Sequence, residues 1–251
     1  TVTGDDITLN ATEDAIMIAG SGALAGSNNY ATSNVAVNLV GSYSDNDITN
    51  TVEAFLQDAT VVANGNLSLT ADDTSKIYSI GGAIVVTIST GGTSGNGAAG
   101  IGATTATNDI TNTIRSYISN SKVNQGQTNS GNVSLTTTSN SDILAIGIAA
   151  SASVTESSTT GGNAGSLAAS VAFSENTINN TVGSFIDSAS VVNVGINSST
   201  TETSSLSVSA TDTSRIQAFS GGIGFSLASG ANSGAVSVGV SLAYNTINNN
   251  T

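Results

Sequence analysis

A seven-residue sequence occurs four times along this chain, with variations, at nearly constant spacing. The copies are NDITNTV at 46–52, NDITNTI at 108–114, NTINNTV at 176–182 and NTINNNT at 245–251. They begin 62, 68 and 69 residues apart (46 to 108, 108 to 176, 176 to 245). A fixed period of this length is typical of a fold in which one unit is stacked on the next, so it constrains the fold more than any local pattern does.

The similarity between repeats continues beyond this anchor sequence. Matching blocks follow it at 52–56, 114–118 and 182–186, then at 67–70, 133–136 and 206–209. No change in composition marks a domain boundary. We therefore divide residues 1–251 as one continuous array: a partial repeat at 1–45, repeats at 46–107, 108–175 and 176–244, and the start of another at 245–251. Because the repeat cycle is under way near residue 7, we expect a segment of a longer precursor.

The block after the anchor fits two periodicities. Val52, Phe55, Leu56 and Ala59 have the spacing of one helix face. The same block also alternates at period two through Val52, Ala54 and Leu56, and resumes after a two-residue slip at Ala59 and Val61. We favour strands, because the alternation continues beyond the slip and the segment is β-branched and lacks helix caps.

The composition favours an all-β fold, a parallel β-solenoid (β-helix). Pro, Cys, His and Trp are absent, and small, polar and β-branched residues suit strands joined by tight corners. We expect coils of about 20–24 residues, hence three coils in each repeat of 62–69 residues, and a rod of about 50–55 Å from roughly 11 coils. The alternative is a string of tandem antiparallel β-sandwiches, although the Asn-Gly and Asp-Gly pairs of tight hairpins are scarce.

Two sets of residues recur at equivalent repeat positions and are candidate sites. We expect the anchor asparagines to lie at corners and to bond the backbone through their amides. They are Asn46, Asn50, Asn108, Asn112, Asn176, Asn180, Asn245 and Asn249. With three coils in each repeat, equivalent asparagines would not be neighbours. The second set is Phe55, Tyr117 and Phe185, which are either a contact row pointing away from the rod axis or part of the core.

Little in the sequence supports catalysis. Without His or Cys, the usual pairs of nucleophile and base cannot be built, so we expect no enzyme activity. Asp45, Asp47, Asp72 and Asp73 lie in oxygen-rich stretches that suit calcium, but the Gly-rich nonapeptide of calcium-binding β-rolls is missing, so incidental or no binding is favoured. We expect no other cofactor.

Charge and hydropathy limit the partners. The formal charge of −13 opposes binding to nucleic acid and to anionic lipid surfaces. There is also no apolar run of about 18 residues that would suggest a membrane-spanning segment. We expect self-association, contacts with other surface proteins, or contacts with glycans.

The sequence Asn-Thr-Ile-Asn-Asn-Thr-Val, followed by an aromatic–aliphatic pair, Ala-x-Val and Leu-Ser-Val-Ser-Ala-Thr, resembles the β-strand repeats of large bacterial surface proteins. These are the filamentous-haemagglutinin-like and leukotoxin-like filamentous adhesins and the autotransporter passengers. The resemblance implies a secreted β-solenoid at the bacterial cell surface. We expect a structural or adhesive stalk, fibre or biofilm-matrix filament that assembles end to end. The alternative is a carbohydrate-binding module that uses the exposed aromatics and acidic loops.

Overall fold

The computed structural model describes residues 1–31, 34–92, 95–127, 130–158, 160–195 and 203–251, and all regular structure within these ranges is β-strand. The strands form five sheets in which every neighbour is parallel. The closing sheet contains β1 (Val2–Gly4), β6 (Thr60–Ala63), β11 (Lys122–Val123) and β16 (Val191–Val192). The two sheets of short strands contain β2 (Ile7–Glu13), β7 (Leu67–Asp73), β12 (Val133–Ser139) and β17 (Leu206–Asp212), and β5 (Thr51–Gln57), β10 (Thr113–Ser119) and β15 (Thr181–Ile186).

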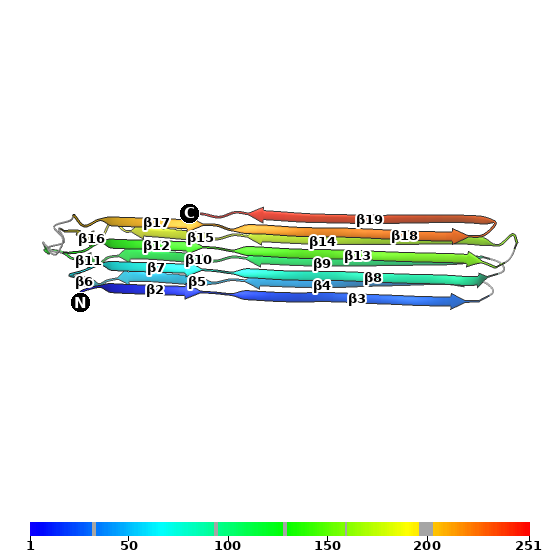
Figure 1. Ribbon diagram of the computed structural model, residues 1–251, viewed down its shortest axis with the longest axis horizontal. Helices are drawn as coiled ribbons and strands as arrows, with labels where there is room; N and C mark the ends of the chain where they lie inside the picture. Colours follow the sequence, from blue (N-terminus) through cyan, green and yellow to red (C-terminus); the bar gives the residue numbers. More distant parts are fainter. Residues whose placement is uncertain (32–33, 93–94, 128–129, 159, 196–202) are drawn as a thin grey trace.

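The two remaining sheets are made of the long strands. The first contains β3 (Ile16–Tyr30), β8 (Lys76–Gly92), β13 (Asp142–Ser157) and β18 (Arg215–Ser229). The second contains β4 (Asn34–Ile48), β9 (Asn96–Ile110), β14 (Asn163–Ile178) and β19 (Asn232–Ile247). The chain runs out along one layer through β7 and β8, returns along the other through β9 and β10, and closes through β11 (Figure 1). The predicted all-β parallel solenoid is confirmed, and the antiparallel sandwich alternative is wrong.

The strand register shows that one repeat makes one coil. Thr113 of β10 pairs with Thr51 of β5 and with Thr181 of β15, which lie 62 and 68 residues away (51 to 113, 113 to 181). The predicted three coils in each repeat, and the rod of roughly 11 coils, are therefore wrong. The described residues form about four coils, whose outermost backbones are about 15 Å apart, whereas each layer extends for about 80 Å along its strands. The molecule is a flat blade (Figure 1).

The coil is larger than expected because the long strands continue through the stretches where corners were expected. Along β8, outward and inward positions alternate from Lys76 to Thr90, and the inward positions carry small residues such as Ser79, Ala83 and Thr87. The facing strand β9 is similar, with Ala98 and Thr104 buried. Small inward side chains let the two layers lie close together over most of the long strands, so glycine and alanine here indicate a thin interior instead of a turn.

The larger core lies between the short strands. Its buried members include Leu69, Ile114, Ile118 and Leu135, and a smaller cluster around Ile77, Ile110, Ile143 and Ile178 fills the space where the short and long strands meet. The strand interpretation of the anchor block is confirmed. The slip after β5 is a corner at which Asp58 adopts a left-handed conformation (φ 51°), as Asn120 does in the next coil (φ 44°). Asp and Asn tolerate this conformation better than most residues do.

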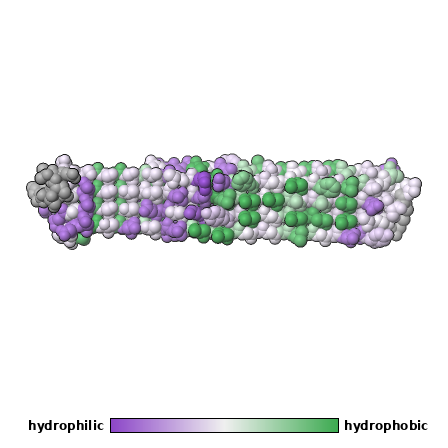
Figure 2. Space-filling view, in the orientation of Figure 1, coloured by the Kyte–Doolittle hydropathy of each residue, from purple (hydrophilic) through white to green (hydrophobic). Residues whose placement is uncertain are grey.

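The outer surface changes character along the blade. Hydrophobic side chains gather over the long strands β3, β8, β13 and β18, and hydrophilic or near-neutral residues cover β2, β7, β12 and β17 (Figure 2). Within the described ranges, no segment forms a helix of the length and hydropathy needed to cross a membrane.

Candidate functional site

The first asparagine of each anchor forms a ladder between the two layers. Asn46 Nδ2 donates to Asn108 Oδ1 (2.7 Å), Asn108 Nδ2 to Asn176 Oδ1 (2.7 Å) and Asn176 Nδ2 to Asn245 Oδ1 (2.8 Å). These residues lie within β4, β9, β14 and β19, and not at corners. Asn46, Asn108 and Asn176 are buried. The ladder exists because each repeat is a single coil, which makes equivalent asparagines neighbours. With the expected three coils in each repeat, these asparagines would not have been adjacent.

The second asparagine of each anchor lies at a break between a long and a short strand. The backbone N–H of Asn50 donates to Asn112 Oδ1 (2.9 Å), that of Asn112 to Asn180 Oδ1 (3.1 Å), and that of Asn180 to Asn249 Oδ1 (2.9 Å). These amides bond the backbone, as the sequence suggests, but the bonded backbone belongs to the preceding coil. The side chain thus provides an acceptor where the strand ladder is interrupted.

The same asparagines also join the two layers. Asn112 Nδ2 donates to Asp73 Oδ2 (3.0 Å) and Ser75 Oγ (2.8 Å) at the break between β7 and β8. Asn180 makes the equivalent bonds to Ser139 and Ser141, and Asn249 to Asp212 and Ser214. We call this set of asparagine, aspartate and serine side chains the polar waist, because it separates the two apolar clusters.

Asp73 is the buried carboxyl of the polar waist. It is 1% exposed. Burial raises the pKa of Asp73 above its ordinary value, hydrogen bonds from Ser75 and Asn112 counteract this in part, and nearby Glu13 adds to the increase. The ionised form therefore costs folding free energy at neutral pH.

The aromatic residues Phe55, Tyr117 and Phe185 lie in register on the outer face of β5, β10 and β15. Their ring centroids are 5.1 and 5.2 Å apart, and adjacent rings are parallel within 6° and 3°. Rings so close and so parallel are stacked, so adjacent rings partly cover one another. A role for these residues as a contact row stays a prediction.

Polar columns flank the aromatic stack. On one side, Arg115 Nη1 lies 3.9 Å from Glu53 Oε1. On the other, Asp187 accepts hydrogen bonds from Ser119 Oγ (2.5 Å) and Ser190 Oγ (2.8 Å). These bonds, that of Ser119 first, hold the pKa of Asp187 below its ordinary value.

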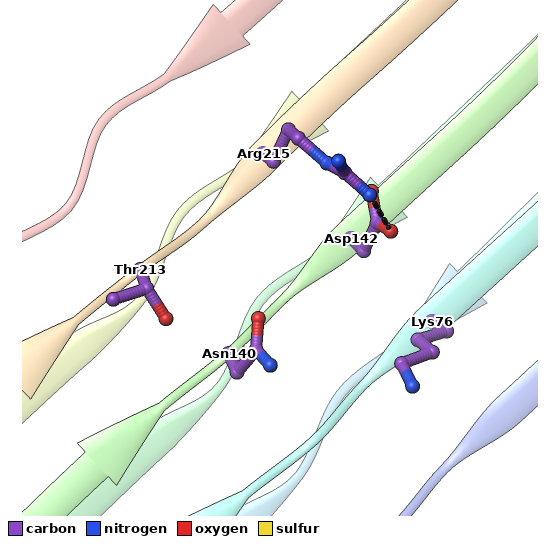
Figure 3. A pocket seen from close by; sticks show the side chains of 5 residues that line it. All are labelled: Lys76, Asn140, Asp142, Thr213 and Arg215. Atoms are coloured by element: carbon purple, nitrogen blue, oxygen red, sulfur yellow. Dashed lines mark hydrogen bonds and ion pairs between the residues drawn. The ribbon is translucent and has the colours of Figure 1, made fainter.

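A charged column crosses the outer surface where the short strands give way to the long ones. Lys76, Asp142 and Arg215 are neighbours in register on β8, β13 and β18 and, with Asn140 and Thr213, line a shallow depression of about 390 Å³ (Figure 3). Arg215 Nη2 lies 2.7 Å from Asp142 Oδ2 and Arg215 Nε lies 3.3 Å from Asp142 Oδ1. This ion pair raises the pKa of Arg215. The depression is lined by charged and polar residues.

The structure separates the four aspartates considered for calcium. Asp45 and Asp47 lie exposed on the outer face of β4, whereas Asp72 and Asp73 belong to β7 in the opposite layer, with Asp73 inside. The described residues contain no group of three or more His, Cys, Asp or Glu side chains that could hold a metal ion.

Comparison with known proteins gives no relative. No protein-family model, curated protein or solved structure matches this chain.

Two features were missed by reasoning from the sequence: the charged column and the apolar outer faces of the long strands. The signal for the column was present, because Lys76 and Arg215 both precede the aliphatic residue that ends the same block. The signal for the faces was the alternation of large aliphatic with small residues across 77–88 and 216–227. In ordinary strands, the larger set would be assigned to the core.

Proposed function

We propose that this chain is a structural segment of an extracellular stalk, fibre or matrix filament of a large repetitive bacterial surface protein, with a mechanical and not a catalytic role. The observation that carries the proposal is the continuous register of parallel strands through all described coils. Each coil is held to the next by backbone ladders, by two rows of asparagine amides and by stacked rings.

This arrangement suits resistance to force and proteolysis. Neighbouring coils are joined by many parallel strand pairs that lie side by side, and this pairing is repeated from coil to coil. The absence of cysteine and the resemblance to adhesin repeats support an exported, cell-surface location. In the described structure, the first and last coils each present one row of unpaired backbone groups, which suits addition of a further coil from the same chain or from another.

Single-molecule pulling on the two ends of the chain tests the mechanical role. Each coil contains 62–69 residues (46 to 108, 176 to 245), so we expect discrete force peaks separated by roughly 200–250 Å of released chain. Extension without resolvable peaks would show that the coils bear no load and would contradict the proposal.

A glycan array tests the binding alternative. The mechanical role predicts no specific, saturable glycan binding at the aromatic stack. Such binding, if abolished in the Phe55→Ala, Tyr117→Ala double variant while the circular dichroism spectrum is unchanged, would favour the carbohydrate-binding module instead.

A further inference from the structure

The outer face of the β3–β8–β13–β18 sheet is unusually apolar for a protein surface. We call it the broad apolar face and define it by the outward positions in register with Tyr78 through Ile88. Its large side chains point away from the interior and include Ile84 (51% exposed), Phe219 (61%), Ile223 (63%) and Phe225 (57%). Because most inward positions between the layers carry small side chains, most of the larger residues of each strand lie outside.

The size of this face fits a protein–protein interface. Eleven residues along the strands (78 to 88) and four strands across give a projected area of about 700 Å². The largest apolar patch on a typical monomer is about 300–600 Å². Two such faces in contact would bury roughly 1,400 Å², within the usual range for a specific interface.

Charge limits what can cover the face. None of its outward positions carries a charged residue, whereas Lys76, Asp142 and Arg215 border one end and Glu156 the other. The net charge of −13 opposes an anionic lipid surface.

Large side chains and glycines are distributed unevenly over this face. The face would fit against the same face of a second copy whose coils run in the opposite order. Phe219 in the fourth coil is in the same column as Gly20 in the first, because Gly20 pairs with Ile80, Ile80 with Ile146 and Ile146 with Phe219. Phe225 and Gly26 end another column in the same way, through Val86 and Ala152. The fourth coil therefore carries two protruding rings where the first carries two hollows.

We infer that the broad apolar face binds the same face of a second copy of this chain, related by a two-fold axis parallel to the strands. After that rotation, each column of residues in register across the coils faces the same column of the second copy. The order of the coils is reversed, so the first coil of one copy faces the fourth coil of the other. Phe219 and Phe225 then lie over Gly20 and Gly26 of the second copy, and the contact is isologous, so both pairs occur twice. The two sheets pack face to face at about 10 Å, as in a β-sandwich.

The charged column supports the same orientation. Lys76 belongs to the second coil and Asp142 to the third, in one column. Reversing the coil order places Lys76 opposite Asp142 of the second copy, whereas rotation about the coil axis would keep the coil order and lose this match. Complementary charges at the rim fix the register of an interface more than they add affinity.

Sedimentation equilibrium of the 251-residue chain over a range of concentrations, with Gly20→Phe and Gly22→Phe as matched variants, tests the inference. At both positions a Cβ would meet nothing within 4 Å in the monomer, so both variants should fold. Gly20→Phe fills the hollow that receives Phe219 and should raise the dissociation constant of the dimer about tenfold or more. Gly22→Phe should change it little, because Gly22 lies opposite Gly221 of the second copy.

The direction of the Gly20→Phe effect separates this dimer from nonspecific association. Added aromatic surface would strengthen nonspecific hydrophobic association, so an unchanged or tighter dimer in Gly20→Phe overturns the inference. A chain that is monomeric at every concentration also overturns it, as does a monomer that binds phosphatidylcholine vesicles. These outcomes leave the mechanical proposal untouched, because pulling is performed on single molecules.

Discussion

The asparagine side chains hold the coils of this protein in register. An amide has one donor group and one acceptor, so a column of buried amides can be satisfied only if every coil contributes its asparagine at the same height. Asn108 illustrates this, since it accepts from Asn46 and donates to Asn176. Sliding one coil by a single residue would leave buried polar groups unpaired in the interior, at a cost of about 1–3 kcal/mol each. The ladder therefore favours one register over its neighbours.

Asp73 should make the stability of the fold depend on pH. Because burial raises the pKa of Asp73, its contribution to stability is fully present below the unfolded pKa of about 3.9. This contribution is lost as the pH rises through the higher folded pKa. In Asp73→Ser, we expect the free energy of unfolding to change less between pH 4 and pH 7 than in the wild type. The measurement is urea denaturation at several pH values.

The neighbouring coil shows that serine fits this position, since Ser139 occupies it and accepts a hydrogen bond from Asn180 (3.1 Å). Asp72→Ser is the matched control, because it removes the same formal charge from the outer face of the same strand. If the free energy of unfolding depends on pH in the same way in both variants, burial of Asp73 at the polar waist is not the cause of the pH dependence.

At the scale of the strands, the thin interior decides which residues each position accepts. The two layers approach each other closely between β18 and β19. A Cβ added at Gly222 would lie 2.4 Å from the backbone oxygen of Val240, and one added at Gly239 would lie 2.3 Å from that of Gly222. Backbone cannot move aside as a flexible side chain can, so these glycines set the spacing of the layers.

Gly222→Val should destabilise the protein by about 1–3 kcal/mol, because the added side chain forces the two layers apart. Thermal and urea denaturation measure the effect. Gly221→Val is the control: Gly221 is adjacent, it points outward, and a Cβ there would meet nothing within 4 Å. We expect Gly221→Val to be neutral or slightly stabilising, since valine suits a strand. Equal losses in the two variants would show that layer spacing is not the constraint.

At the scale of the molecule, the repeat of the anchor sequence was enough to predict stacked parallel strands, because identical segments at a fixed period pair naturally in register. It was not enough to predict the size of the coil. Coil size depends on how often the chain turns between Asn46 and Asn108, and the expected coils of about 20–24 residues would have needed additional corners in this stretch. In the structure, β8 runs from Lys76 to Gly92 and β9 from Asn96 to Ile110, and the glycines and alanines within them line a narrow interior.

The anchor asparagines show the same limit at the candidate site. Their recurrence was evident from the sequence, and so was their ability to bond backbone groups. That they are direct neighbours could not be predicted, because adjacency follows from the number of coils in each repeat. Likewise, the equal spacing of Phe55, Tyr117 and Phe185 showed that they are equivalent, but their stacking required the coil of 62–68 residues.

The central claim, that each repeat is one coil, is tested most directly by introducing cysteine pairs, since the chain has no cysteine of its own. Thr70 and Thr136 pair across adjacent strands β7 and β12, about 4.8 Å apart, and Thr70→Cys with Thr136→Cys should form an intramolecular disulfide under mild oxidation. Ser209 continues the same column one coil further on, about 10 Å from Thr70, so Thr70→Cys with Ser209→Cys should stay reduced. A disulfide in the first pair and none in the second is the predicted result. The absence of a disulfide in the first pair, or an intramolecular disulfide in the second, would contradict the one-coil repeat.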